Sequence, residues 1–106
     1  MVARFDVFLV SLDADISREA KNTRPCVVVS PNEMNGNISN VIIAPLSSGT
    51  AAYPTRIAVD FLNNERMVVL DQIRTVDKRR LVKKIGEIDH TDQGQILERL
   101  QEMFAE

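Results

Sequence analysis

One run of residues, Thr23 to Ser30, restricts the fold of this chain more than any other segment. The three valines at 27–29 are branched at Cβ, which limits their rotamers and favours an extended backbone. Pro25 fixes its own φ and keeps Arg24 out of the helical region. We therefore predict a buried strand over 25–30, with a permanently charged guanidinium at its entrance.

Further short apolar segments have the pattern of strands and are separated by polar or glycine-containing segments. They cover residues 5–12, 40–46, 55–60, 67–75 and 84–88. Pro45 indicates an edge or a bulge near the end of its strand. Short helical turns are predicted after Pro31 and over 76–81, and tight turns at 35–36 and 63–64.

The C-terminal segment has the pattern of one amphipathic helix. Thr91 is a plausible N-cap, and Asp92 is favourable in the first turn. Apolar residues then recur at helical spacing, at Ile96, Leu97, Leu100, Met103 and Phe104. Short strands followed by one helix predict a mainly β fold, a small antiparallel barrel closed by a C-terminal helix.

Size and composition favour one soluble domain over residues 1–106. The chain is 44% hydrophobic and 26% charged, without an apolar run long enough for a membrane span or a signal peptide. We therefore expect a cytoplasmic protein. Cys26 and His90 are the only residues of their types, which argues against a Cys/His zinc site and against a pair of catalytic histidines. We expect Cys26 to be a buried apolar residue and His90 to be solvated near the helix start.

Charge is distributed unevenly along a chain whose net charge is only −2. Residues 74–84 contain six cationic side chains and one carboxylate, Asp77. Residues 87–106 contain six carboxylates and one arginine or lysine, Arg99. The two segments largely cancel in the total. A local basic stripe of this kind can attract a phosphate backbone although the whole protein is acidic.

Four segments carry side chains that could form a site. They contribute Arg18, Glu19 and Arg24; Ser47 and Ser48; Asp71, Gln72 and Arg74; and Lys78 to Arg80. An arginine fork suits phosphate, although an ion pair between Arg24 and Glu19 or another carboxylate is an alternative. The sequence has no glycine-rich phosphate loop, metal-carboxylate motif or nucleophile elbow.

Taken together, several motifs resemble the MazF/PemK family of toxin endoribonucleases. They are Thr23-Arg24-Pro25 with its valine run, Ala44-Pro45-Leu46-Ser47, Tyr53-Pro54-Thr55-Arg56 and, above all, the segment Leu70-Asp71-Gln72-Ile73-Arg74-Thr75-Val76-Asp77-Lys78-Arg79-Arg80-Leu81. The resemblance extends over nearly the whole chain in order. It implies an SH3-like barrel of the CcdB/PemK type, a homodimer, and cleavage of single-stranded RNA without a metal or other cofactor.

The resemblance also implies roles for particular residues. Arg24 matches a catalytic arginine, Ser47 stands where the family has a catalytic threonine, and Glu19 matches an acidic residue of the first loop. Because arginine is hardly ever deprotonated, a carboxylate such as Glu19 or Asp71 is the easier general base. We predict catalytic roles for Arg24, Ser47 and Glu19. Substrate-binding roles are predicted for Arg18, Lys21, Thr23, Ser48, Asp71, Gln72, Arg74, Lys78 and Arg79.

Besides Ser47, the chain departs from the family pattern at three places. Arg18 stands at the position of a histidine in the PemK-like branch, Phe5 replaces a common glycine, and 63–66 replaces a segment with Gly and Asp-Ser. Alternatives are a toxin of the same fold that acts on DNA gyrase and a decayed, non-catalytic binding module. The gyrase toxin depends on a C-terminal Trp-Gly-Ile that this chain lacks. As a toxin, the chain is expected to have a cognate antitoxin with an acidic, disordered tail as its partner.

Overall fold

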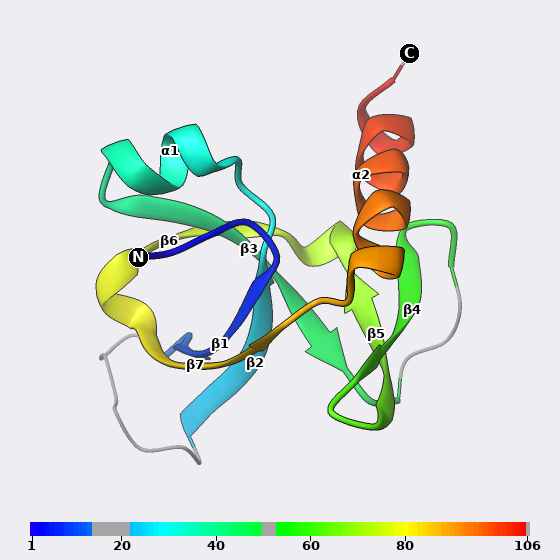
Figure 1. Ribbon diagram of the computed structural model, residues 1–106, viewed down its shortest axis with the longest axis horizontal. Coiled ribbons are helices and arrows are strands. Elements are labelled where there is room, and N and C mark those ends of the chain that lie inside the picture. The colour runs from blue at the N-terminus through cyan, green and yellow to red at the C-terminus, as the bar shows by residue number, and fades with distance from the viewer. Residues whose placement is uncertain (14–21, 50–52, 106) are drawn as a thin grey trace.

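A curled antiparallel sheet forms most of the molecule, as a computed structural model shows for residues 1–13, 22–49 and 53–105 (Figure 1). The strands follow the order β4-β5-β3-β2-β1-β7, and β6 pairs with β3. Their bounds are β1 Asp6–Ser11, β2 Thr23–Val28, β3 Asn40–Ser47, β4 Arg56–Phe61, β5 Asn64–Val69, β6 Arg74–Asp77 and β7 Leu81–Glu87. The helices are α1 Asn32–Asn37 and α2 His90–Phe104. The predicted mainly β, SH3-like fold with a C-terminal helix is therefore confirmed.

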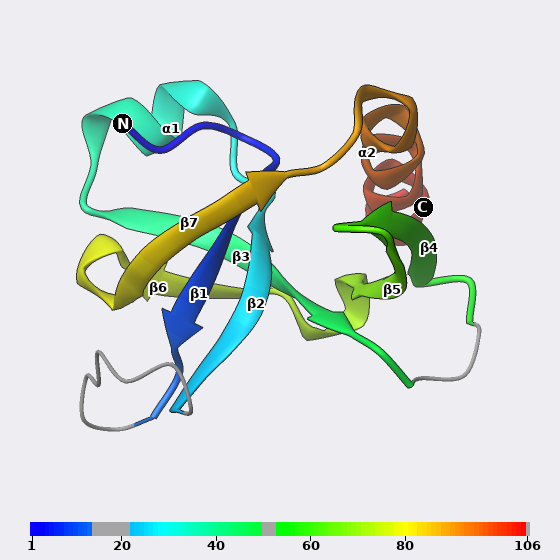
Figure 2. The ribbon, with the colours of Figure 1, turned by 60° about the horizontal axis from the view of Figure 1, so that its bottom comes forward.

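Strand β3 loses its β2 partner near its end, and this loss shapes the surface around the site. On one edge of β3, residues 43–45 pair with β2 as far as Cys26↔Pro45. On the other edge its first residues pair with β6, and its last two residues, Leu46 and Ser47, pair with β5. The ladder between β2 and β3 therefore stops at Pro45, which has no N–H to donate. The sequence predicted an edge or a bulge at this residue, and the structure shows the end of a ladder. Beyond it, the start of β2 and the end of β3 diverge (Figure 2).

Some predicted boundaries were wrong. The single strand predicted over 67–75 is β5 and β6, separated by a 3-10 turn at Leu70–Gln72, because β5 pairs with the end of β3 and β6 with its first half, and the residues between them exceed those of β3. Of the helical turn predicted over 76–81, only Lys78–Arg80 is helical, in a second 3-10 turn. The turn predicted at 35–36 lies inside α1. The N-cap of α2 is Asp89 and not Thr91 as predicted, because the helix already begins at His90; the hydroxyl of Thr91 donates to Asp89 Oδ2 at 3.2 Å.

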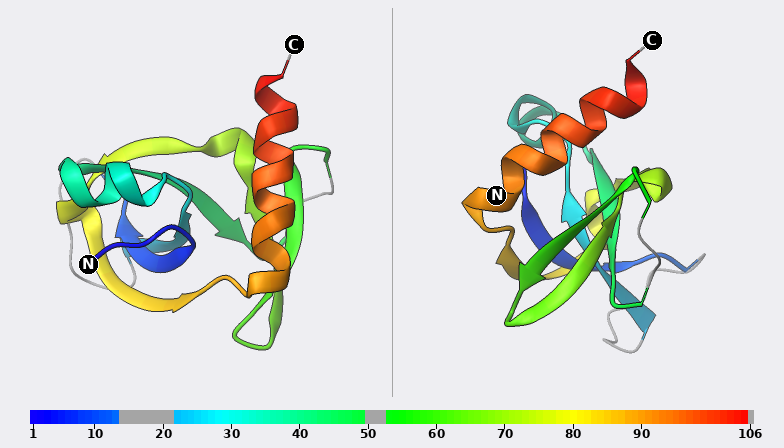
Figure 3. Two further views of the ribbon diagram at one scale, coloured as in Figure 1. Left: turned by 45° about the horizontal axis from the view of Figure 1, so that its top comes forward. Right: turned by 90° about the vertical axis from the view of Figure 1, so that its right-hand side faces the viewer.

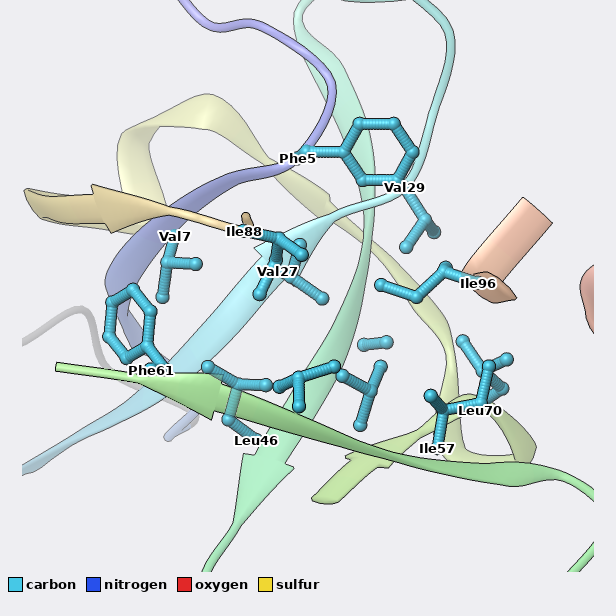
Figure 4. Close-up of a cluster of buried hydrophobic side chains, with 13 residues drawn as sticks. Phe5, Val7, Val27, Val29, Leu46, Ile57, Phe61, Leu70, Ile88 and Ile96 are labelled. Carbon is cyan, nitrogen blue, oxygen red and sulfur yellow. The ribbon is translucent and has the colours of Figure 1, made fainter. Parts of the chain in front are cut away.

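The hydrophobic core lies on both faces of the central strands. One cluster joins β1, β2 and β3 to the β4–β5 hairpin and α2; Figure 4 shows Phe5, Val27, Leu46 and Ile96 in it. A second cluster on the other face contains Val10 and Cys26. Burial of both faces agrees with the apolar runs of β1 and β2, which are internal strands of the sheet.

Helix α2 lies against the β4–β5 side of the sheet (Figure 3). Ile96 is fully buried, and Leu97, Leu100 and Met103 pack against the core, as their spacing predicted. Phe104, the last of the predicted apolar stripe, is instead 71% exposed. Within the ranges that the structure describes, neither helix is long and apolar enough to cross a membrane.

The backbone is irregular in the β4–β5 turn and in β7. The β4–β5 turn places Leu62 and Asn63 at φ values of 51° and 64°, so the turn predicted at 63–64 begins one residue earlier. In β7 the pairing with β1 shifts between Val7↔Gly86 and Phe8↔Lys84, which leaves an extra residue in β7. Gly86 takes a φ of 156° there, with its α-carbon beside the ring of Phe61.

Candidate functional site

Three of the predicted site residues line one cavity of about 260 Å³. Arg24 comes from the start of β2, Ser47 from the end of β3, and Gln72 from the 3-10 turn after β5. The rest of the wall is apolar and consists of Leu12, Pro45, Leu46 and Val69. The cavity lies where β2 and β3 separate beyond Pro45, so the fold itself brings the guanidinium, the hydroxyl and the amide around one space.

Arg24 also lines a second cavity. Its lining residues are Leu12, Asp13, Asn22 and Arg24, and its volume is about 200 Å³. Arg24 is an exposed residue that pairs with Val10 of β1. A guanidinium that lines two hollows of the surface is accessible to a phosphate, which it can bind through its planar donor fork.

The neighbours of Arg24 and Ser47 in the chain differ in accessibility. Ser48 is exposed directly after β3. Thr23 is only 6% exposed and faces the interior opposite Ser11 of β1. Thr23 is therefore placed to support the start of β2 rather than to offer its hydroxyl at the surface.

Asp71 has its carboxylate engaged by two side chains from the start of β4. Arg56 donates from Nε to Oδ1 at 3.1 Å and from Nη2 to Oδ2 at 3.2 Å, and the hydroxyl of Thr55 donates to Oδ1 at 3.0 Å. The hydrogen bond from Arg56 is the main reason that the pKa of Asp71 lies below its ordinary value, and Thr55 acts in the same direction. A general base needs an available lone pair and a raised affinity for protons, so this environment disfavours Asp71 in that role.

The basic turn after β6 is held by Asp77. The backbone N–H of Arg79 donates to Asp77 Oδ1 at 2.8 Å and its Nε at 3.2 Å, and the pKa of Asp77 is lowered, mainly by the backbone donor. Lys78 is half-buried, and Arg79 is exposed. Arg80 turns the other way and donates to the backbone carbonyls of Ser11 and Asp13. The turn thus presents Lys78 and Arg79 to solvent while Arg80 braces the end of β1.

The remaining titratable candidates have the environments expected of them. Cys26 is fully buried, and burial raises the pKa of its thiol to about 12, although Arg74 on the neighbouring part of the sheet acts in the opposite direction. A thiol of this kind is protonated at neutral pH and packs as a small apolar group. His90 is exposed as the first residue of α2. Arg74 is exposed on β6 opposite Ile43.

Three of the predicted residues, Arg18, Glu19 and Lys21, lie outside the described residues. Conversely, sequence reasoning did not select Arg56, Thr55 or Tyr53 as site residues. The guanidinium of Arg56 lies 4.8 Å from the centre of the Tyr53 ring, in the range of a cation–π contact. The spacing Tyr-x-x-Arg is the one local signal of this contact, and the pairing with Asp71 joins residues 15 positions apart.

Comparison with known proteins decides the family. Residues 3–104 match the family described as PemK-like, MazF-like toxins of type II toxin–antitoxin systems. This chain belongs to the PemK/MazF toxin family. It is 32% identical over 91 residues to the endoribonuclease MazF of Staphylococcus epidermidis, an alignment that covers 80% of this chain and 76% of the relative. It is 29% identical over 111 residues to the endoribonuclease EndoA of Bacillus subtilis, with 99% and 96% covered.

Solved structures of PemK/MazF toxins share the fold. An endoribonuclease in complex with its cognate antitoxin, from Mycobacterial species, superposes with a TM-score of 0.81 at 22% identity and covers 96% of this chain and 93% of its own. A MazE–MazF structure from Deinococcus radiodurans gives a TM-score of 0.78 at 18% identity, with 98% and 95% covered. Because these identities are low, the superpositions support the barrel and its C-terminal helix, which carry the cavity described above.

Proposed function

We propose that this member of the PemK/MazF family is the toxin of a toxin–antitoxin pair and a sequence-specific endoribonuclease that cleaves single-stranded messenger RNA and so stops translation and growth. The observation that carries the proposal is the convergence of Arg24 and Ser47, two predicted catalytic residues from different strands, on one cavity. The endoribonuclease activity named for the relatives in S. epidermidis and B. subtilis supports the same reaction.

The proposed chemistry is a metal-independent transesterification. The ribose 2′-OH loses its proton and attacks the adjacent phosphorus, the P–O5′ bond breaks, and the 5′ oxygen leaves with a proton. The products are a 2′,3′-cyclic phosphate and a 5′-OH. Negative charge grows on the phosphoryl oxygens in the transition state, and fixed donors stabilise it there more than in the substrate. Arg24 supplies a charged two-point contact, and the hydroxyl of Ser47 donates to a non-bridging oxygen.

Glu19 is proposed as the general base or as the group that orients Arg24. The engagement of Asp71 by Arg56 and Thr55 leaves it less suited to accept the 2′-OH proton, which favours Glu19 of the two carboxylates. If Glu19 is the base, Glu19→Gln lowers kcat strongly. A Glu19→Gln variant with unchanged cleavage, beside an inactive Arg24→Ala variant, would assign the base elsewhere.

The proposed RNA path uses the other predicted substrate-binding residues. Phosphate contacts are proposed for Arg18, Lys21, Arg74, Lys78 and Arg79, and contacts to sugars or base edges for Ser48 and Gln72.

Protein partners are proposed from the relatives and from the family resemblance. The antitoxin seen with the Mycobacterial relative supports an antitoxin partner for this chain. An acidic tail of such an antitoxin would compete with RNA for the same cations. The family resemblance supports a homodimer.

The deciding experiment incubates the purified chain with a long single-stranded RNA in EDTA and maps the fragment ends chemically. We expect cuts at short recurrent motifs with cyclic-phosphate ends. Arg24→Ala should abolish them, and Arg24→Lys should recover little, because an ammonium lacks the planar fork.

Lys83→Ala is the matched control. Lys83 pairs with Leu9 and Arg24 with Val10, so the two cations lie on opposite faces of the sheet. The Lys83→Ala variant should cut like the unaltered chain. Intact RNA from a folded wild-type protein would overturn the proposal and direct the next assay to DNA gyrase binding.

A further inference from the structure

Tyr53 is a large aromatic residue left at the surface beside the proposed active site. Tyr53 is 58% exposed, and the guanidinium of Arg56 covers one side of its ring, 4.8 Å from the ring centre. The Arg56 side chain is only 17% exposed. The arginine therefore lies beneath the tyrosine, and the ring retains a large solvent-accessible area.

The arginine under the ring is fixed in place. Two parallel hydrogen bonds bind its guanidinium to Asp71, and Thr55 donates to the same carboxylate. This pairing raises the pKa of Arg56 above its already high value, so the group is always charged. A bidentate pair sets the plane of the guanidinium, and that plane sets the orientation of the ring stacked on it.

The backbone that carries the ring is held as well. The N–H of Arg56 donates to the carbonyl of Tyr53 at 2.9 Å, and Arg99 of α2 donates to the carbonyl of Pro54. An exposed ring on a fixed backbone loses little conformational entropy when a ligand binds.

The same carboxylate connects this platform to the cavity. Asp71 is followed directly by Gln72, which lines the cavity with Arg24 and Ser47. The ring, through Arg56 and Asp71, and the cavity, through Gln72, are therefore attached to adjacent residues of one short 3-10 turn, Leu70–Gln72.

We propose that Tyr53 is a stacking subsite for one nucleobase of the single-stranded RNA, next to the cleaved phosphate, and that Arg56 and Asp71 are its positioning residues. This inference rests on the proposed RNA cleavage. Unpaired bases bind proteins by stacking on aromatic rings, and each stack changes affinity by about tenfold. A cation beneath the ring makes the outer face less electron-rich and suits it to a base.

The composition of the chain provides a direct readout of this site. Tyr53 is the only tyrosine and the chain has no tryptophan, so tyrosine emission reports on this ring alone. The probe is an oligonucleotide with 2′-O-methyl riboses that contains the mapped cut motif, which binds but lacks the attacking 2′-OH. Stacking should quench the emission, after correction for absorption by the oligonucleotide. Replacing bases one at a time by abasic positions should abolish quenching at one position adjacent to the cut.

Cleavage and binding assays use two substitutions of the ring and one elsewhere. Tyr53→Phe should behave like the unaltered chain, whereas Tyr53→Leu should raise KM and the Kd for the oligonucleotide about tenfold with little change in kcat or Tm. Phe104→Leu removes an exposed aromatic ring at the end of α2 and should change neither constant.

Arg56→Lys and Asp71→Asn test the positioning roles. Each should raise KM in the Tyr53 background and have no further effect on KM in the Tyr53→Leu background, because without the ring there is nothing left to orient. Equal losses of thermal stability and kcat in both backgrounds would mean that the pair supports the fold only.

The proposal would be overturned by an oligonucleotide that leaves the emission unquenched, or by an unchanged KM for Tyr53→Leu. If that variant instead loses affinity only for an acidic peptide, the ring binds a protein partner and the RNA subsite is refuted. These results are distinct from failure of the proposed function, in which the unaltered chain itself leaves RNA intact.

Discussion

Gly86→Ala should destabilise the protein more than a single methyl group does at most positions. A Cβ at residue 86 would lie 2.9 Å from Cε1 and 3.0 Å from Cζ of the Phe61 ring, closer than carbon atoms pack. Phe61 is itself part of the buried core, so the ring has little room to move. Overpacking of this kind costs about 1–3 kcal/mol. The backbone φ of 156° adds strain for any side chain, of order 1 kcal/mol or more.

The assay is thermal unfolding followed by circular dichroism at one protein concentration. A total loss of about 2–4 kcal/mol corresponds to a fall in Tm of about 10–20 °C for a domain of this size. Gly94→Ala is the matched control, because Gly94 lies in α2 with no atom near the added methyl group. It should raise stability by about 1 kcal/mol through helix propensity.

The Phe61 ring can be tested as the cause. Phe61→Leu alone should destabilise by loss of buried area, but in the Gly86→Ala background it should remove the clash, so that the two losses do not add. A Tm for Gly86→Ala within about 2 °C of the unaltered chain would refute the reasoning, as would strictly additive losses in the double variant.

Three further outcomes follow from single positions. Leu62→Asn should stabilise by about 1 kcal/mol in urea unfolding, because Leu62 holds a φ of 51° that asparagine tolerates better; a loss of stability would show that the leucine side chain packs there. Cys26 should resist iodoacetamide at pH 8 in the native protein and react fully in guanidinium, since its pKa is about 12; fast native alkylation would contradict its burial. Asp77 has a lowered pKa in the folded state, so its ionised form stabilises the fold above the unfolded value near pH 4, and this contribution disappears as the pH falls through the folded value. Asp77→Asn should therefore lower Tm at pH 7 and match the unaltered chain near pH 2; a constant difference at both pH values would contradict this linkage.

Local chemistry accounts for the parts of the fold that the sequence predicted. The β-branched run after Pro25 and the helical spacing from Ile96 are signals contained within a few residues, and both elements were found. The break between β5 and β6 was missed because Leu70 and Ile73 continue an apolar pattern. What breaks the strand is its pairing with β3: Val68 pairs with Leu46 and Arg74 with Ile43, so the five residues 69–73 lie opposite only two residues of β3 and form the turn. This mismatch depends on segments far apart in sequence.

The candidate site divides in the same way. Arg24 and Ser47 were selected through the family resemblance, and the structure brings them to one cavity beside the point where the ladder between β2 and β3 stops at Pro45. The role of Asp71 was not visible, because Asp71 lies in the 3-10 turn after β5 and its partner Arg56 in β4 reaches it only when the β4–β5 hairpin forms. Long-range pairings of charged side chains leave no periodic trace, so spacing alone could not reveal this one.

Phe5 shows how a departure from the family pattern can be tolerated. It stands where the family resemblance predicts glycine and takes a φ of 75°, which costs a side-chain-bearing residue about 1–2 kcal/mol. Its ring is 7% exposed within the core, and burial of a phenylalanine side chain contributes about 1.5–3 kcal/mol. The backbone is held on both sides, since its N–H donates to Val28 at 2.7 Å and its carbonyl accepts from Ile88 at 2.9 Å. Because the strain and the burial are of similar size, phenylalanine can replace glycine here without disturbing the cavity, whose lining does not include Phe5 among the residues that the structure describes.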